Sequence, residues 1–260
     1  MALDEVKLSL ANKFTGGVKG NRVVRSTTAN SGAAWEIQPS VIVSPTGVDD
    51  TANIMDAITG LGSGGGSVEF TPGNYQHTGL VISGRSNVML FAHARPGAGG
   101  MVSSRCTNPA MDCLRINGGY HIGLSGLYFG HSLLSNTGVA AIRVQGVNKL
   151  GLTDVSTENY PSQSGSRNGL ILQAGDSSEA FLTCCVFSNH LENGITIGNE
   201  TGVRYRVLET VISDCVLFAN AGSGVRVVDY VAGTYIRASN FTSNGRTIDI
   251  VATVDDGRTV

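Results

Sequence analysis

The chain has 260 residues, of which 41% are hydrophobic, only 15% are charged and 35 are glycine. This apolar fraction can form a sizeable core, whereas so few charges leave little material for exposed helix faces, which favours an all-β protein. The formal net charge of -2 excludes a nucleic-acid binder that depends on phosphate contacts, because such proteins need a basic field. No apolar run is long enough to span a bilayer, so we expect neither nucleic-acid binding nor membrane insertion.

Residues 1–40 form the first part of the chain, which we expect to be an N-terminal arm. The stretch 27–33 consists of small and polar residues, and such a segment cannot bury much of itself. It is either a disordered leader or an arm that orders against a partner, and the sequence leaves both open. Charged residues recur through the first 25 positions and interrupt any signal-peptide core, which predicts synthesis in the cytoplasm without a signal peptide.

Residues 41–110 form the second part, where we expect a capping helix and the first coils. Asp49 or Asp50 can cap a helix over residues 51–61, and the Gly/Ser run 60–67 then ends it. The apolar face of this helix consists of Ile54, Ala57, Ile58 and Leu61. Short strands are predicted to follow at residues 68–70, 80–82 and 88–91.

Residues 111–260 form the third part, which contains a repeat. Six strand-like triplets recur, each with two apolar residues on either side of a residue that varies. By subtraction of residue numbers, their first residues lie 28, 28, 25, 30 and 23 positions apart. A period of about 20–50 residues is the signature of a solenoid or array. The triplets are Leu114-Arg115-Ile116, Ile142-Arg143-Val144, Leu170-Ile171-Leu172, Ile195-Thr196-Ile197, Val225-Arg226-Val227 and Ile248-Asp249-Ile250.

These units fit a parallel β-helix better than other repeat architectures. A propeller blade needs about 40–45 residues and four strands, and no unit shows the sustained 3.6-residue period of paired helices. A coil of about 25 residues fits three short strands joined by turns, with apolar side chains stacked inside and the middle residue of each triplet outside. The predicted fold class is therefore all-β, a parallel β-helix solenoid with an N-terminal arm and a short capping helix.

Turn residues precede three of the triplets and predict sharp corners. Asparagine followed by glycine supplies a positive φ at low steric cost, which such a corner needs. The dipeptides are Asn168-Gly169, Asn193-Gly194 and Ser223-Gly224.

Two further stacks are expected from residues that recur at the repeat spacing. Four asparagines follow the second apolar patch of successive coils, and we expect their amides to form a ladder. Cys185 and Cys215 are expected to stack as small core residues, whereas a bridge is conceivable between Cys106 and Cys113. The four asparagines are Asn159, Asn189, Asn220 and Asn244.

The entry to the repeat resembles a known family. Residues 47–51 read GVDDT, Ala57-Ile58 follow, and residues 65–75 read GGSVEFTPGNY. These motifs are similar to the entry segment of pectin-lyase-like right-handed parallel β-helix proteins, in which the first forms a capping helix and the second the first coil. The resemblance implies this fold and not one activity, because the superfamily includes pectate lyases, polygalacturonases, epimerases and bacteriophage tailspikes.

Within that superfamily, the layout is most similar to bacteriophage tailspike and tail-fibre proteins. These commonly lack a signal peptide, begin with a short particle-binding segment and continue through a similar cap. The resemblance implies a homotrimer in the virion tail that attaches to other tail subunits through residues 1–40 and recognises bacterial surface polysaccharide. Because the coils are few and no trimerising end is evident, we expect either a fragment or a chain whose end another subunit covers.

Cleavage of a polysaccharide by hydrolysis requires two carboxyl groups that face one groove, one protonated and one ionised. Glu209 lies about one coil after Glu179, so these two carboxylates are expected to stack. The alternative is that all the candidates are solvated surface or turn residues. The candidate catalytic residues are Asp154, Glu158, Glu179, Glu209 and Asp214.

The outward middle positions of the triplets form a candidate ligand-binding row. Arg115 and Arg143 are expected to stack on adjacent coils, and Arg226 is expected to lie beside Asp249. Guanidinium groups bind the carboxylate of an acidic sugar bidentately; alternatively, Arg226 and Asp249 form an ordinary surface salt bridge. The five histidines lack metal-ligand spacing, so neither a metal nor a cofactor is predicted.

Three functions follow from these observations. The first is a virion tail protein, spike or fibre, that recognises host surface polysaccharide and has depolymerase activity as a further expectation. The others are a free β-helix polysaccharide lyase or hydrolase and a non-catalytic structural virion protein. The lack of a clear acid pair places binding or scaffolding ahead of catalysis, and whether the chain is an enzyme stays open.

Overall fold

The computed structural model describes residues 23–25, 39–93, 102–132, 140–159, 165–173, 178–198, 207–228 and 233–251. Most of the expected N-terminal arm, residues 1–22 and 26–38, lies outside these ranges. Within them, no helix is both long enough and apolar enough to cross a membrane.

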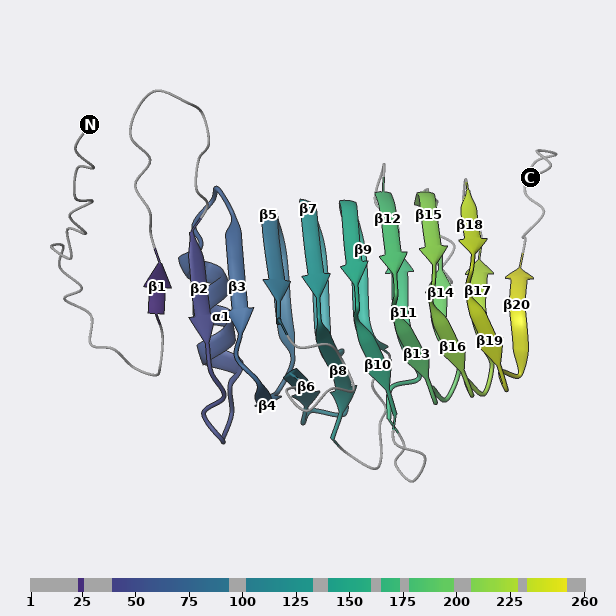
Figure 1. Ribbon diagram of the computed structural model, residues 1–260, viewed down its shortest axis with the longest axis horizontal. Coiled ribbons are helices and arrows are strands. Elements are labelled where there is room, and N and C mark those ends of the chain that lie inside the picture. The colour runs from purple at the N-terminus through teal and green to yellow at the C-terminus, as the bar shows by residue number, and fades with distance from the viewer. Residues whose placement is uncertain are drawn as a thin grey trace, which may run out of the picture.

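Twenty strands and one helix make up the described part of the chain (Figure 1). They are β1 (Val23–Arg25), β2 (Ser40–Val43), α1 (Thr51–Gly60), β3 (Gly66–Phe70), β4 (Gly73–His77), β5 (Leu80–Phe91), β6 (Val102–Cys106), β7 (Leu114–Ser125), β8 (Leu127–His131), β9 (Ala140–Thr153), β10 (Ser156–Glu158), β11 (Asn168–Gln173), β12 (Ser178–Thr183), β13 (Val186–Ser188), β14 (Ile195–Ile197), β15 (Val207–Ser213), β16 (Val216–Phe218), β17 (Ser223–Val228), β18 (Thr234–Arg237), β19 (Asn240–Thr242) and β20 (Arg246–Val251).

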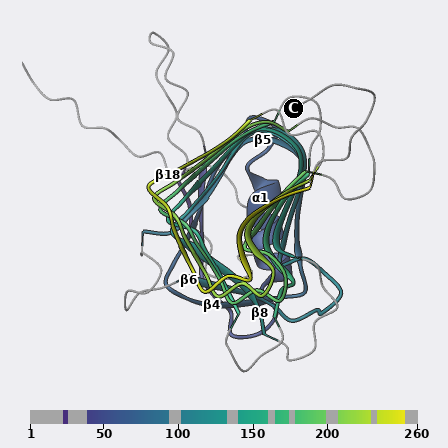
Figure 2. The ribbon, with the colours of Figure 1, turned by 90° about the vertical axis from the view of Figure 1, so that its right-hand side faces the viewer.

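The strands stack in two sheets around one interior, which Figure 2 shows end-on. The 13-stranded sheet has the order β1-β2-β3-β5-β7-β9-β11-β14-β17-β20 with β12, β15 and β18 on a branch, and the seven-stranded sheet has the order β19-β16-β13-β10-β8-β6-β4. The long strands β5, β7 and β9 turn a corner, and β12, β15 and β18 continue their second halves in later coils. All pairs are parallel except β1 with β2, so the predicted all-β parallel solenoid is confirmed.

The triplet repeat runs along the larger sheet, and its predicted register is confirmed. Each triplet pairs residue for residue with the next, from residues 114–116 in β7 to residues 248–250 in β20. Residues 80–82 of β5 add a further triplet on the N-terminal side. The flanking leucines and isoleucines of β7, β11 and β14 are buried, and each such side chain contributes about 1.5–3 kcal/mol. On the last described strand, Ile248 and Ile250 are exposed.

Helix α1 packs against β2, β3 and β5 and lies across the interior at the N-terminal end of the stack (Figures 1 and 2). Its predicted apolar face, which includes Ile54 and Ile58, is buried. Of the two candidate capping residues, Asp49 is the one whose carboxylate accepts the backbone N–H of Thr51, at 2.9 Å. Asp50 instead accepts backbone N–H groups from neighbouring segments. Asp50 thus occupies the N-cap position without a side-chain cap hydrogen bond, and hydrogen bonds from Thr51 lower the pKa of the Asp49 carboxyl.

The glycines before the triplets have a different role from the predicted one. Gly169, Gly194 and Gly224 do not adopt a positive φ, so the expectation of left-handed corners at these dipeptides is wrong. A Cβ atom on Gly169 would lie 2.5 Å from the carbonyl oxygen of Gly194, and one on Gly194 would lie 2.8 Å from that of Gly224. These positions need glycine because successive turns of the chain approach each other closely.

The predicted asparagine ladder is present at three of its four positions. Asn220 Nδ2 donates to Asn244 Oδ1 at 2.8 Å, and the backbone N–H of His190 donates to Asn220 Oδ1 at 3.1 Å. His190 therefore holds the position before Asn220 in this column. Asn189 lies one residue earlier, in a left-handed corner with φ 60°, and is out of the column, whereas the buried Asn159 continues it, with Nδ2 3.4 Å from His190 Nδ1.

His190 is a buried ionisable group in this ladder. Its Nε2 lies 2.9 Å from Thr157 Oγ1, and its side chain has no room for solvent. Burial lowers the pKa of His190 from its ordinary value of 6.5 to about 4, because the charged form loses its hydration. The ring is thus neutral in the folded protein at neutral pH.

Replacing His190 with Asn, the residue of the next two positions in the column, should remove part of the acid sensitivity. The unfolded wild type takes up a proton below pH 6.5 and the folded protein only below about 4, so stability falls as pH drops through this window and is complete above it. Urea unfolding at pH 7.5 and 4.5 should show the wild type losing about 2–3 kcal/mol more than His190→Asn. An equal loss in both proteins would contradict the assignment.

Candidate functional site

The outer surface of the second half of β5, β7 and β9 carries residues in direct register. Met89 pairs with Gly123, Gly123 with Gly151, and Gly151 with Phe181 of β12. These positions face outward, because the residues on either side of them in each strand are buried. Met89 and Phe181 therefore stand about 14 Å apart, three strand spacings, with no side chain rising from the two turns between them.

This gap forms an open groove with a volume of about 490 Å³. Its size falls within the range of small-molecule sites, about 300–1,000 Å³. The residues that line it are Asn87, Val88, Met89, His121, Ile122, Gly123, Lys149, Leu150, Gly151 and Phe181.

The two glycines on the floor are not required by the backbone. Neither Gly123 nor Gly151 has a positive φ, and a Cβ atom on Gly151 would meet nothing within 4 Å. On Gly123 a Cβ would meet only the flexible end of Met89, with the sulfur at 2.4 Å. A glycine inside a strand costs about 0.5–1 kcal/mol relative to alanine, and it often marks the close approach of a ligand. The Met89 side chain thus lies over Gly123, and Gly151 keeps its part of the floor bare at a cost in stability.

A polar rim borders one side of the groove. Asn87, His121 and Lys149 occupy the corner of three successive turns in the left-handed conformation, with φ 55°, 54° and 69°. Lys149 Nζ lies 3.9 Å from Glu179 Oε2, and both side chains are partly exposed. The groove therefore combines an exposed aromatic ring, a thioether and several hydrogen-bonding groups along a flat floor.

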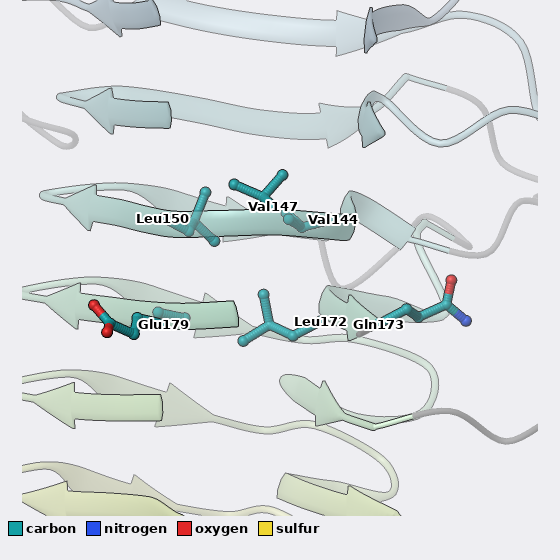
Figure 3. A pocket seen from close by; sticks show the side chains of 7 residues that line it. Val144, Val147, Leu150, Leu172, Gln173 and Glu179 are labelled. Atoms are coloured by element: carbon teal, nitrogen blue, oxygen red, sulfur yellow. The ribbon is translucent and has the colours of Figure 1, made fainter. Parts of the chain in front are cut away.

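A second hollow, nearer the interior, is too small to hold a ligand (Figure 3). Its volume is about 10 Å³, which is at the limit for a single water molecule. Glu179 and Gln173 lie at opposite ends of it in Figure 3, and the remaining labelled side chains are aliphatic. This hollow is a packing gap at the corner where β11 and β12 both pair with β9.

The five candidate catalytic residues fall in three separate places. Glu179 and Glu209 pair in direct register, so their backbone positions lie on adjacent turns as predicted. Asp154 and Asp214 occupy another corner, with φ 52° and 54°, and are two turns apart. Glu158 lies at the end of β10 in the smaller sheet. Within the described ranges the groove lining contains no carboxylate, and a catalytic role for these residues stays a prediction.

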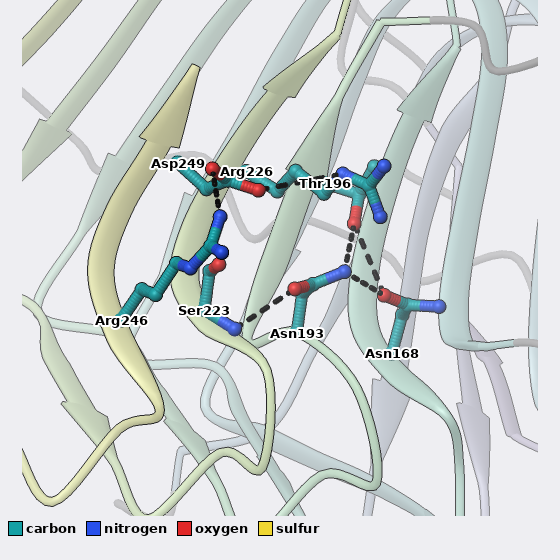
Figure 4. A network of polar contacts seen from close by, with 7 residues as sticks. All are labelled: Asn168, Asn193, Thr196, Ser223, Arg226, Arg246 and Asp249. Carbon is teal, nitrogen blue, oxygen red and sulfur yellow. Dashed lines mark hydrogen bonds and ion pairs between the residues drawn. The ribbon is translucent and has the colours of Figure 1, made fainter. Parts of the chain in front are cut away.

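The predicted outward row is present, and its charges are largely paired (Figure 4). Arg115 pairs in register with Arg143, and Arg226 with Asp249. Asp249 lies 3.9 Å from Arg226 Nε and 2.7 Å from Arg246 Nη1. These exposed contacts are worth little in stability, but they compete with any acidic ligand at that end of the row.

Polar side chains fill the space beside this row. Asn193 Nδ2 donates to Asn168 Oδ1 at 3.1 Å, and the backbone N–H of Ser223 donates to Asn193 Oδ1 at 2.9 Å. Thr196, the middle residue of its triplet, donates to Asn168 Oδ1 at 3.0 Å (Figure 4). This buried ladder joins three turns and is a second stack, which was not predicted from the sequence.

Arg143 differs from the other members of the row because it forms an ion pair with a buried carboxylate. Its Nε donates at 2.8 Å to the carboxylate of Asp112, which is buried and also accepts the backbone N–H of Ala140. Arg115, in the turn before, has an Nε with no hydrogen-bond partner in the described residues. Within the described residues, Arg143 therefore forms a buried ion pair, whereas the Nε of Arg115, at the equivalent position one turn earlier, forms no hydrogen bond.

Arg143→Met should reduce the free energy of unfolding by about 3–5 kcal/mol, because Asp112 is left as an uncompensated buried charge. Arg115→Met keeps most of the packing and breaks no ion pair of this kind, so it should cost about 1 kcal/mol or less. Urea unfolding of the two variants measures the difference. Equal losses would show that the Arg143–Asp112 pair has no special structural role.

Comparison with known proteins does not assign this chain to a family. No protein-family model and no curated protein matches it. Among solved structures, ORF18 of Geobacillus virus E2 is similar, with a TM-score of 0.43 and 13% sequence identity. The match covers 81% of this chain and 62% of that protein. The class defined by the chain's own geometry is a parallel β-solenoid with an open groove on one outer face.

The groove is the site that sequence reasoning missed. Its signal was present, since an outward residue directly precedes the buried leucine of the second patch in each coil. Aligned on those leucines, the column reads Met89, Gly123, Gly151, Phe181. Two glycines between a methionine and a phenylalanine would have indicated a bare floor between two apolar walls.

Proposed function

We propose that this protein is a bacteriophage virion tail component, a spike or fibre, that binds polysaccharide on the host cell surface. The observation that supports this most is the bare floor at Gly151, beside Phe181, because a flat groove next to an aromatic ring suits the flat face of a sugar ring. Phe181 offers that ring, and the polar rim offers donors and acceptors for hydroxyl groups. As with tailspikes, we expect a homotrimer attached to other tail subunits through residues 1–40.

Binding is favoured over cleavage within this proposal. The residues that line the groove carry no pair of carboxyl groups, and Glu179 reaches only its rim through Lys149. A glycosidase needs two carboxyl groups about 5–9.5 Å apart on either side of the scissile bond. The function supported best is therefore recognition of polysaccharide. Depolymerase activity is a separate prediction that an experiment must test.

Gly151→Val should abolish polysaccharide binding without harming the fold. The new side chain enters open space and the strand gains a β-branched residue, so stability should stay equal or rise by about 0.5–1 kcal/mol. Binding to an array of bacterial capsular polysaccharides and lipopolysaccharides is the measurement, together with thermal unfolding. Thr153→Val is the matched control, because Thr153 faces outward two residues further along the same strand and outside the groove lining.

The result would contradict the proposal if Gly151→Val bound the same polysaccharides as the wild type with unchanged affinity. Absence of binding by the wild type across such an array would leave a purely structural virion protein. New reducing ends or unsaturated products after incubation would indicate depolymerase activity. Glu179 and Glu209 would then be the first candidate catalytic residues to replace.

Phe181→Ala should weaken the same binding about tenfold, which corresponds to about 1.4 kcal/mol. The ring is 44% exposed, so its removal should change the free energy of unfolding much less than removal of a core residue would. Phe218→Ala is the control, because Phe218 is similarly exposed at 42% but lies in β16 of the smaller sheet. Equal affinity of Phe181→Ala and wild type for the array ligand would exclude stacking on this ring.

A further inference from the structure

A cluster of cysteine and histidine side chains lies in the interior beside the smaller sheet. His77, Cys106 and His131 are in direct register on β4, β6 and β8, and Cys113 precedes β7. All four residues are buried. The ligand atoms of Cys106, Cys113 and His131 lie within 4.8 Å of one another. Residues far apart in the repeat thus bring two thiols and an imidazole to one point.

The hydrogen bonds of His131 fix its tautomer. Its Nε2 lies 2.8 Å from the carbonyl oxygen of Met111, which can only accept, so Nε2 carries the proton. The neutral ring then presents the lone pair of Nδ1, which lies 3.4 Å from Cys113 Sγ and 2.7 Å from Ser166 Oγ. A histidine that binds a metal through one nitrogen commonly donates the other N–H to a backbone carbonyl. His131 already has this arrangement.

His77 does not belong to the ligand set despite its place in the column. Its Nδ1 accepts the backbone N–H of Gly79 at 3.2 Å, so in the neutral ring Nε2 carries the proton and is 2.9 Å from Ser104 Oγ. Both nitrogens of His77 are engaged, as are those of His131, but only His131 places a ligand atom within 4.8 Å of both sulfurs. The available ligands are two sulfurs and one nitrogen.

We propose that Cys106, Cys113 and His131 bind a Zn²⁺ ion that joins the loop before β7 to β6 and β8. Tetrahedral zinc has Zn–S distances of about 2.3 Å and Zn–N distances of about 2.0–2.1 Å, which place ligand atoms about 3.5–3.8 Å apart. The 3.4 Å between Cys113 Sγ and His131 Nδ1 is close to that requirement, and no other pair of ligand atoms is more than 4.8 Å apart. Soft thiolates combined with imidazole favour zinc over calcium or magnesium, and a water molecule would complete the tetrahedron.

Binding is balanced by proton release. Each of the two thiols loses its proton to solvent as its sulfur bonds to the metal, and no electron is transferred. The two thiolates neutralise the charge of Zn²⁺, so the buried complex carries no net charge. The site is independent of the outer groove, and its loss would not by itself affect the proposed function.

The chain supplies its own control in a second pair of stacked cysteines. Cys185 and Cys215 interact on adjacent turns, as predicted, but among the described residues no histidine completes a ligand set with them. A metal that bound thiols without regard to geometry would treat the two pairs alike. A metal that needs the Cys106–Cys113–His131 arrangement would not.

The test uses the full chain, reduced, loaded with ZnCl₂ and freed of unbound metal by gel filtration. Elemental analysis should give one zinc ion per chain for the wild type and for Cys185→Ser, and at least a fivefold loss for Cys113→Ser and His131→Gln. Zinc at wild-type level in both cluster variants would overturn the proposal, as would zinc-free wild type after loading.

A measurement on the wild type alone covers the case in which a cluster variant does not fold. Loading with Co²⁺ in place of zinc should give the visible absorption of tetrahedral, thiolate-bound cobalt, and ZnCl₂ should abolish it. Bound metal should also slow the alkylation of Cys106 and Cys113 relative to the metal-free protein, as followed by mass spectrometry, whereas the equally buried Cys185 and Cys215 should react at the same rate with and without metal. A disulfide between these two in the protein as isolated, with no metal uptake after reduction, would overturn the proposal.

Discussion

The backbone hydrogen bonds that join each turn of the chain to the next in parallel are the constraint on which this structure depends. They place every residue of one turn directly on its counterpart in the next, as the six triplets show. A slip of one residue would move the apolar side chains from the interior to the surface. Turns of unequal length, from 23 to 30 residues, are accommodated because the differences fall between the paired strands.

This register converts single residues into columns, and the columns carry the chemistry. Inside, aliphatic columns form the core, while buried polar columns require a partner at every level, as in the Asn168–Asn193 and Asn220–Asn244 contacts. On the outer surface, each turn contributes one exposed position to a column. Two adjacent turns without a side chain, Gly123 and Gly151, are enough to open a groove.

The same constraint explains why the outward charges do not form a uniform basic stripe. Arg143 is held by a buried aspartate from the loop before β7, one turn earlier, and Arg226 faces Asp249 on the next turn. A row of unpaired arginines stacked about 4.8 Å apart would repel. The register thus provides a ligand with a flat floor between side chains of the adjacent turns.

Sequence reasoning predicted those features that depend on the period alone. The triplet register, the buried face of α1 and the Cys185–Cys215 stack all follow from residues that recur in phase. Features that depend on contact between unlike segments were missed. Gly169 is small because the next turn approaches it, and the partner of Arg143 lies in an irregular loop.

The cysteine–histidine cluster and the asparagine ladder show the same limit. Cys113 lies outside the strand register and approaches Cys106 and His131 only through the folded loop. His190 replaces asparagine in a column whose members are 30 and 24 residues apart, so letter matching aligns Asn189 by mistake. Unequal spacing shifts the apparent alignment by one residue, and one residue separates inside from outside.

The most direct test of the account is a crystal structure of the chain with an oligosaccharide from a polysaccharide that it binds. We expect a sugar ring above Gly151, with one face against Phe181 and hydroxyl groups within hydrogen-bond distance of His121 or Lys149. A sugar bound on the smaller sheet or along the arginine row, with the groove over Gly123 and Gly151 empty, would contradict it.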